Sequence, residues 1–160
     1  MTIRTGIGFD AHRFAEDREL FLGCVKIPFD RGLEGHSDAD VLAHAICDSM
    51  LGAAGLGDIG KHFPDTDPTY KGASGASLLE QTREKIVRAG FEVSNVDAVV
   101  ICEKPLITPY AEEMSGKIAE AIGIAPGAVN IKATTTEKMG WTGAGEGIAA
   151  KAICLITEKP

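Results

Sequence analysis

Residues 35–55, GHSDADVLAHAICDSMLGAAG, decide the expected fold. From residue 40 to residue 54 apolar side chains recur at the spacing of one helix face, which predicts a helix that packs against another layer. Ser37 and Asp38 can cap the first turn of this helix, and Gly55 can end it in the left-handed conformation that glycine tolerates. A helix is therefore expected over residues 40–54.

Outward from this helix, the chain alternates segments with strand patterns and segments with helix patterns. Runs of apolar or β-branched residues predict strands over residues 3–9, 20–28, 96–102, 129–134 and 148–156. Helical spacing predicts two further helices, at about residues 76–89 and from Pro109 to residue 122, and residues 57–75 indicate a long functional loop. Strands that alternate with helices predict an α/β sandwich, and residues 1–160 are expected to form one domain.

The composition excludes several classes of protein. The chain has 23 acidic and 16 basic residues and a formal charge of -7, which argues against sequence-independent binding of nucleic acid. No apolar run reaches the ~18–20 residues that a membrane helix needs, so no membrane partner is expected. The four cysteines include no CxxC pair and lie in apolar contexts, which is typical of a reduced, cytoplasmic protein. Residues 55–60, GLGDIG, match the dinucleotide pattern GxGxxG, but they follow a predicted helix and not a strand, so no Rossmann site is expected.

Asp10 and His12 form the strongest chemical signal. Residues two apart on a strand point to the same side, so this carboxylate and this imidazole converge. Gly6 and Gly8 lie just before them, and glycines inside a strand often mark the close approach of another group. His44, on the polar face of the predicted helix, is the best third ligand, and an Asp/His/His set leaves one position open as catalytic zinc requires. With four histidines in the chain, a chance grouping remains the alternative.

Other polar segments suggest a phosphate site. His36, next to the expected helix start, could contact a phosphate. Residues 134–136 are three threonines at the end of a predicted strand, and Glu137 could hold a hard cation such as magnesium. The alternative is an ordinary surface strand, in which threonine is a good β-former. Asp58 and Asp65, in the long loop, are by themselves typical turn formers.

Three ordered blocks of sequence, taken together, resemble one family closely. They are GIGFDAHRF at residues 6–14, GHSDADVLAHAICDSMLGAAGLGDIGKHFPDTDP at 35–68 and IKATTTEKMGWTGAGEGIAA at 131–150. This pattern resembles the 2-C-methyl-D-erythritol 2,4-cyclodiphosphate synthase family of the non-mevalonate isoprenoid pathway. The resemblance implies a ferredoxin-like two-layer α/β sandwich, a mixed sheet with helices on one face, and a homotrimer with sites between neighbouring subunits.

The resemblance also implies a reaction and its cofactors. The substrate would be 4-diphosphocytidyl-2-C-methyl-D-erythritol 2-phosphate, whose 2-phosphate attacks its own β-phosphate, closes a cyclic diphosphate and expels CMP. Because such a phosphoryl transfer depends on positioning and charge neutralisation, no nucleophilic side chain is needed. The implied metal ligands are Asp10, His12 and His44 for one Zn²⁺ per site, and Glu137 for Mg²⁺ or Mn²⁺ bound with the substrate.

The remaining implied site residues divide by the part of the substrate that they would meet. His36 and Thr135 would steady the transition state, with Ser37 and Trp141 also in the binding site. Those around the methylerythritol phosphate would be Asp58, Ile59, Gly60, Phe63, Pro64, Asp65, Thr66 and Asp67. Those around the cytidine diphosphate, largely through their backbone, would be Cys102, Glu103, Lys104, Pro105, Leu106, Ile107 and Thr108, with Thr134 and Thr136.

The chain departs from the family pattern at three positions. Ala144 stands where many members have an arginine that in some of them helps to bind an isoprenoid diphosphate in the central cavity of the trimer. Leu106 stands in place of a common lysine, and Trp141 in place of a frequent phenylalanine. Two other functions stay open: a zinc-dependent phosphohydrolase that uses water, and a non-catalytic nucleotide-binding or metal-storage module.

Overall fold

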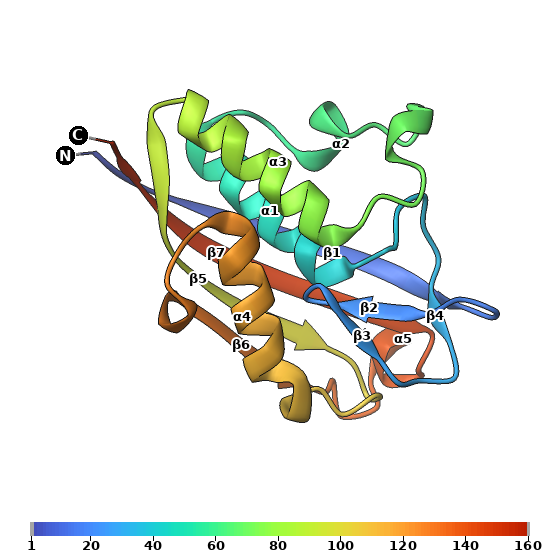
Figure 1. Ribbon diagram of the computed structural model, residues 1–160. Coiled ribbons are helices and arrows are strands. Elements are labelled where there is room, and N and C mark those ends of the chain that lie inside the picture. The colour runs from blue at the N-terminus through green and yellow to red at the C-terminus, as the bar shows by residue number, and fades with distance from the viewer. Residues whose placement is uncertain (1, 160) are drawn as a thin grey trace.

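The computed structural model describes residues 2–159 and contains a five-stranded mixed sheet (Figure 1). Its strands, in the order β4-β1-β7-β5-β6, are β4 (Gly32–Leu33), β1 (Ile3–Ala15), β7 (Gly147–Glu158), β5 (Phe91–Ile101) and β6 (Val129–Thr134). The β5–β6 pair is parallel, and the other neighbouring pairs are antiparallel. The expected mixed α/β architecture is therefore confirmed.

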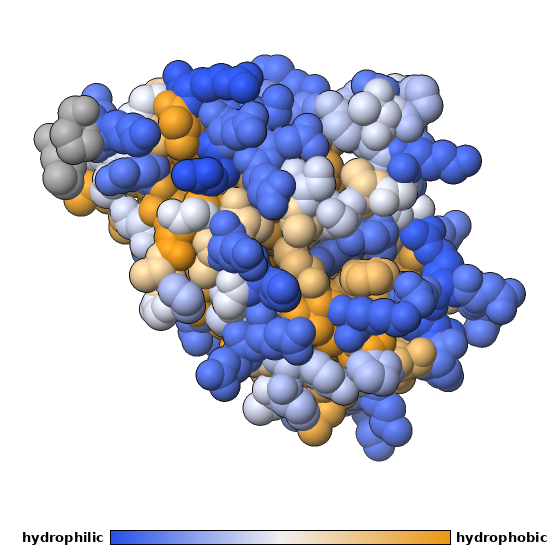
Figure 2. Space-filling view, viewed as in Figure 1, coloured by the Kyte–Doolittle hydropathy of each residue, from blue (hydrophilic) through white to orange (hydrophobic). Residues whose placement is uncertain are grey.

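Three helices lie against one face of the sheet: α1 (Val41–Ala54), α3 (Gly75–Arg88) and α4 (Ala111–Ile122) (Figure 1). The short elements are α2 (Ile59–His62), α5 (Gly140–Gly143) and the 3₁₀ turns η1 (Pro68–Tyr70), η2 (Thr108–Tyr110) and η3 (Pro126–Ala128). Hydrophilic residues dominate this side of the molecule, as Figure 2 shows. Across residues 2–159, every helix is too short or too polar to cross a membrane.

Helix α1 lies at the centre of the core. All its residues are buried except Asp48 and Gly52, so it is enclosed by β1 and β7 on one side and by α3 on another. Its bounds match the prediction, and Gly55 ends it in the left-handed conformation at φ 73°. The expected caps were wrong, because the Asp40 carboxylate, and not Ser37 or Asp38, accepts from the Ala43 N–H at 3.0 Å.

The predicted strand over residues 20–28 is instead a hairpin of β2 (Leu20–Leu22) and β3 (Val25–Ile27). Gly23 and Cys24, at its turn, have φ of 57° and 65°, the left-handed geometry that two-residue hairpin turns require. The Asp40 carboxylate also accepts from the N–H groups of both turn residues, at 2.9 and 2.7 Å. One fully buried carboxylate thus joins the hairpin to the start of α1, a link that the apolar pattern of residues 20–28 does not reveal.

Strand β1 runs six residues beyond its predicted end at Phe9, because β7 pairs with it from Ile3 to Arg13. Its even-numbered residues face α1: a Cβ on Gly6 would lie 1.9 Å from the Ser49 carbonyl oxygen, and one on Gly8 would lie 1.8 Å from that of Ala45. The predicted close approach at these glycines is confirmed, and the group that approaches is the backbone of α1.

The other elements differ from prediction mainly at their ends. Residues 108–110 form a 3₁₀ turn, so the third helix begins at Ala111 instead of Pro109, and the loop over residues 57–75 contains α2 and η1. Strand β6 has the predicted bounds, whereas β5 begins five residues earlier than expected. The four cysteines, which all lie within the described chain, are free, and three of them are buried, in agreement with their apolar contexts.

Gly8→Ala is expected to lower the free energy of unfolding by about 3 kcal/mol or more, because the added methyl group would force β1 away from α1. Urea denaturation followed by circular dichroism measures the change. Gly116→Ala, inside α4 with nothing within 4 Å of the new Cβ, is the control and should stabilise by about 0.5–1 kcal/mol. Equal stability of Gly8→Ala and wild type would contradict the tight packing of β1 on α1.

Candidate metal centre and substrate pocket

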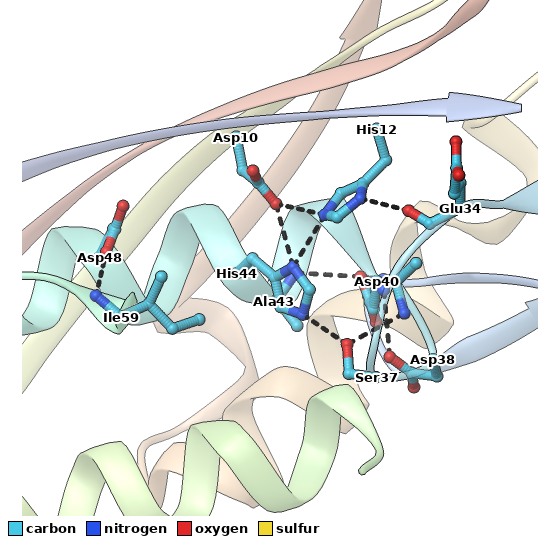
Figure 3. A network of polar contacts seen from close by, with 12 residues as sticks. Asp10, His12, Glu34, Ser37, Asp38, Asp40, Ala43, His44, Asp48 and Ile59 are labelled. Atoms are coloured by element: carbon cyan, nitrogen blue, oxygen red, sulfur yellow. Dashed lines mark hydrogen bonds and ion pairs between the residues drawn. The ribbon is translucent and has the colours of Figure 1, made fainter. Parts of the chain in front are cut away.

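Asp10 and His12 on β1 meet His44 on α1 (Figure 3). Asp10 Oδ2 lies 2.9 Å from His12 Nε2 and 3.0 Å from His44 Nδ1, and the two ring nitrogens are 3.1 Å apart. The three donor atoms all lie within 4.8 Å of one another. Because Asp10 and His12 share the face of β1 that touches α1, His44 lies opposite both of them, and the structure brings together the three residues that the sequence suggested.

The outer nitrogen of each imidazole has an acceptor. His12 Nδ1 lies 2.6 Å from the Glu34 carbonyl oxygen, and His44 Nε2 lies 3.1 Å from Ser37 Oγ (Figure 3). When the outer nitrogens carry the hydrogens, the inner nitrogens and the Asp10 carboxylate present only lone pairs to one another. Such a set is stabilised by a cation between the three atoms.

The donor set and its spacing fit a divalent metal. Two imidazole nitrogens and one carboxylate oxygen are ligands that zinc accepts, and tetrahedral bonds of about 2.0–2.1 Å would place donor atoms about 3.3 Å apart. The observed separations of 2.9–3.1 Å need only a small expansion. The three residues therefore form a candidate divalent metal site.

The charges in this cluster are strongly coupled. Burial by itself would raise the pKa of Asp10, but hydrogen bonds from His12 and His44 outweigh it and hold the pKa well below its usual range. Burial would lower the pKa of His12, but the hydrogen bond and charge of Asp10 outweigh it and the pKa is raised. Since a metal ligand must be deprotonated, protons compete with the metal as the pH falls through the raised pKa of His12.

A cavity of about 350 Å³ opens beside these three residues. Besides Asp10, His12 and His44, its walls come from residues 35–37, the long loop and α3, and they comprise Gly35, His36, Ser37, Ile59, Gly60, Phe63, Pro64, Asp65, Tyr70 and Leu78. Five of the eight residues expected around a methylerythritol phosphate are in this wall. The three others serve the loop or face solvent: Asp58 accepts from the Lys61 N–H, Asp67 accepts from the Thr69 N–H, and Thr66 is exposed.

Sequence reasoning did not single out Asp48, which lies four residues after His44 on α1. Its carboxylate accepts from the Ile59 N–H at 2.7 Å and so ties α2, which forms part of the cavity wall, to α1 (Figure 3). The spacing of Asp48 four residues after His44 was the available signal for this role. His62, in the same loop, has its Nε2 2.9 Å from the Leu56 carbonyl oxygen.

Most of the other predicted site residues lie in the segments that follow β5 and β6. Thr134 ends β6, which is three strands from β1, or about 14 Å at the usual strand spacing. Beyond it, Thr135 Oγ1 accepts from the Glu137 N–H at 3.2 Å, and the Glu137 side chain is exposed. The Glu103 carboxylate accepts from the N–H groups of Thr136 and Lys138 at 3.3 and 3.1 Å, so the two predicted cytidine segments are held together.

Within the first of these segments, Cys102 and Ile107 are buried, and the Cys102 thiol donates to the Pro105 carbonyl oxygen at 3.6 Å. These two residues can therefore offer a ligand only their backbone, whereas Leu106 is 72% exposed. Trp141, on α5, lines a second hollow together with Ala11, His12, Arg13 and Glu146. None of the residues from 102 to 108 or from 134 to 141 is in the wall of the cavity beside Asp10.

Comparison with known proteins agrees with this geometry. The model of the YgbB family matches residues 3–157. The chain belongs to the YgbB family. The 2-C-methyl-D-erythritol 2,4-cyclodiphosphate synthase of Agathobacter rectalis is 56% identical over 155 residues, which cover 97% of this chain and 88% of that relative.

Solved structures of related proteins are also similar to this chain. The bifunctional IspDF of Campylobacter jejuni has a TM-score of 0.94 and 43% identity over 98% of this chain, which spans 42% of that longer chain. The IspF of Plasmodium falciparum, solved as a CDP complex, has a TM-score of 0.85 and 33% identity, with coverage of 99% and 97%. The predicted resemblance, and with it the prediction of an enzyme with the synthase function of this family, are confirmed.

We expect the wild-type protein to bind one Zn²⁺ per chain at pH 7.5, with affinity that falls as the pH is lowered from 7.5 to 5.5, because protonation of His12 competes. Asp10→Asn should weaken binding at least about 100-fold, since it removes the only negative ligand. Competition with a chromophoric chelator measures both. Glu84→Gln, which removes an exposed carboxylate from α3, is the control and should bind as wild type; equal affinity of Asp10→Asn and wild type would contradict the site.

Proposed function

We propose that this YgbB-family protein converts 4-diphosphocytidyl-2-C-methyl-D-erythritol 2-phosphate to 2-C-methyl-D-erythritol 2,4-cyclodiphosphate and CMP. The observation that carries the proposal is the set of three converging donor atoms of Asp10, His12 and His44 beside a cavity of about 350 Å³. A phosphate ester is the group that such a cation site would orient, and the cavity has room for a small phosphorylated polyol.

The reaction is an intramolecular phosphoryl transfer. An oxygen of the 2-phosphate forms a bond to the β-phosphorus, and the bond from that phosphorus to the oxygen shared with the α-phosphate breaks, so CMP leaves with the bridging oxygen. The protein must hold the two phosphates in line and neutralise their charge. The walls from Ile59 to Asp65 would hold the methylerythritol end, and His36, which lines the same cavity, would donate a hydrogen bond to a phosphate oxygen.

Two cations complete the proposal. Asp10, His12 and His44 would hold Zn²⁺, and Glu137 would help to hold Mg²⁺ or Mn²⁺ together with the substrate. When bound, these cations supply Lewis acidity and offset the negative charge of the substrate. Thr135 would act with His36 on the reacting phosphate, and residues 102–108 with Thr134 and Thr136 would hold the cytidine diphosphate.

A homotrimer would join the two halves of this site. In one chain the two cytidine segments follow β5 and β6, which are two and three strands from β1, and they lie outside the cavity beside Asp10. The face of the sheet opposite the helices leaves Ile3, Ile7, Phe9 and Ile153 between 50 and 60% exposed, an apolar surface that a second copy could cover. We therefore propose one ferredoxin-like domain per chain, in a trimer whose neighbours pair the β6 edge of one copy with the Asp10 cavity of the next.

The reaction is tested by incubation of the protein with the substrate and Mg²⁺ in ¹⁸O water, followed by mass spectrometry. Equimolar CMP and unlabelled cyclic diphosphate are expected, and His44→Ala should lower the rate at least about 100-fold. A product that carries ¹⁸O would show a zinc-dependent phosphohydrolase instead. Intact substrate would indicate a non-catalytic nucleotide-binding or metal-storage module, and either result would overturn the proposal.

The shared site is tested by complementation. His44→Ala and Glu137→Gln should each be nearly inactive alone, because each removes a cation ligand. After the two variants are unfolded and refolded together, random trimers should regain about a quarter of wild-type activity, since one site in four would combine an intact His44 with an intact Glu137 from its neighbour. No recovery in mixtures that form trimers by sedimentation would show that each site lies within one chain.

A further inference from the structure

One short segment, residues 34–37, orients both histidines of the candidate metal centre. The Glu34 carbonyl oxygen accepts from His12 Nδ1 at 2.6 Å, and Ser37 Oγ lies 3.1 Å from His44 Nε2. These contacts leave His12 Nε2 and His44 Nδ1 facing each other and Asp10. Partners of this kind fix the ring tautomer and orientation of histidine ligands.

The backbone of this segment is hydrogen-bonded to Arg18, a residue that the sequence did not single out. Arg18 Nη1 donates to the Gly35 carbonyl oxygen at 2.7 Å, and Nη2 donates to the Ser37 carbonyl oxygen at 2.8 Å. The planar fork of the guanidinium group thus spans the two carbonyls on either side of His36. Hydrogen bonds from a charged donor are shorter and stronger than neutral ones, so the pair restrains the backbone of residues 35–37.

The position of Arg18 is in turn set by tight packing. A Cβ on Gly32 would lie 2.7 Å from the Arg18 carbonyl oxygen and 2.4 Å from that of Glu19, so the backbone of β4 passes directly against residues 18 and 19. Strand β4 leads into residues 34–37, and it pairs with the end of β1 beyond His12. Arg18 therefore connects the chain after β1 to the segment that faces both imidazoles.

We propose that Arg18 is a positioning residue for the metal centre, which acts through residues 34–37 on His12 and His44 and thereby sets the affinity for the divalent cation. The inference rests on the metal site proposed above. Arg18 is not itself part of the cavity wall, and its guanidinium group bonds to the backbone of two wall residues, Gly35 and Ser37, rather than to the three ligands. Its effect passes through the Ser37 hydroxyl to His44 and through the Glu34 carbonyl to His12.

Ser37 has a second possible role that the test must separate. Ser37 Oγ, His44 and Asp10 are connected by contacts of 3.1 and 3.0 Å, the order of a nucleophile, a base and an acid. The Ser37 hydroxyl oxygen, however, already accepts from the Ala39 N–H at 3.1 Å and the residue is only 9% exposed, which suits an acceptor for His44 better than an attacking group.

The test measures Zn²⁺ affinity by chelator competition in the full-length protein and in Arg18→Met, Arg18→Lys and Ser37→Ala. Arg18→Met and Ser37→Ala should each weaken binding roughly 10–100-fold. Arg18→Lys should restore part of the affinity, because one ammonium group can still reach a carbonyl. The double variant, with both Arg18→Met and Ser37→Ala, should have about the Zn²⁺ affinity of whichever single variant binds less tightly. The two effects should not add, since both changes act through Ser37 on His44. Arg88→Met, on the exposed face of α3, is the matched control and should bind as wild type.

Ring ¹⁵N chemical shifts of His44 in the metal-free protein give an independent reading. Wild type should show the hydrogen on Nε2, and Ser37→Ala and Arg18→Met should show a mixture of tautomers.

Unchanged affinity and tautomer in Arg18→Met would overturn the inference, even if that variant is less stable. Loss of activity in Ser37→Ala with unchanged Zn²⁺ affinity would identify Ser37 as a nucleophile instead. If the wild type itself binds no Zn²⁺, the proposed metal site fails, and the inference fails with it.

Discussion

The backbone of β1 touches the backbone of α1 because Gly6 and Gly8 carry no side chains, and the rest of the site depends on this contact. A Cβ at either position would come within 2 Å of a carbonyl oxygen of the helix. Since alternate residues of a strand share one face, the same register that puts these glycines against α1 also directs Asp10 and His12 toward it. His44 lies on the same helix, near the end that Asp40 caps, and so meets them both.

The buried Asp40 carboxylate and the Arg18 guanidinium group hold the two sides of the centre. Asp40 joins the N-terminus of α1 to the turn of the β2–β3 hairpin, so the helix that carries His44 cannot shift relative to the hairpin without breaking two hydrogen bonds. Arg18 holds residues 35–37 at two carbonyls, and these residues meet the far side of the histidines. The charged side chains of Asp40 and Arg18 thus hold main-chain segments in place by hydrogen bonds, and these segments in turn orient the metal ligands.

The net charge of -7 fits this organisation. The proposed substrate carries several negative charges, and an acidic chain has few spare cations to offset them. Three groups that present only lone pairs to one another can hold a cation firmly, and that cation can then offset the phosphate charge. Positive charge in this protein is therefore expected to come largely from bound metal rather than from lysine and arginine.

The sequence by itself determined the features that depend on residues close together in the chain. Helical periodicity with Gly55 at its end marked α1, and Gly6 and Gly8, just before Asp10 and His12, marked a close approach. Ordered motifs also identified the family.

The sequence did not reveal that residues 20–28 turn back at Gly23 and Cys24, because the left-handed turn is supported by a carboxylate 16 and 17 residues away. It did not reveal the roles of Arg18, Asp48 or Glu34 either. Arg18 and Asp48 bind backbone groups, and Glu34 acts through its own carbonyl oxygen, and because every residue has such groups no motif can record them. Residue types and spacing thus decided which groups can do chemistry, and only the tertiary structure decided which backbone atoms hold them in place.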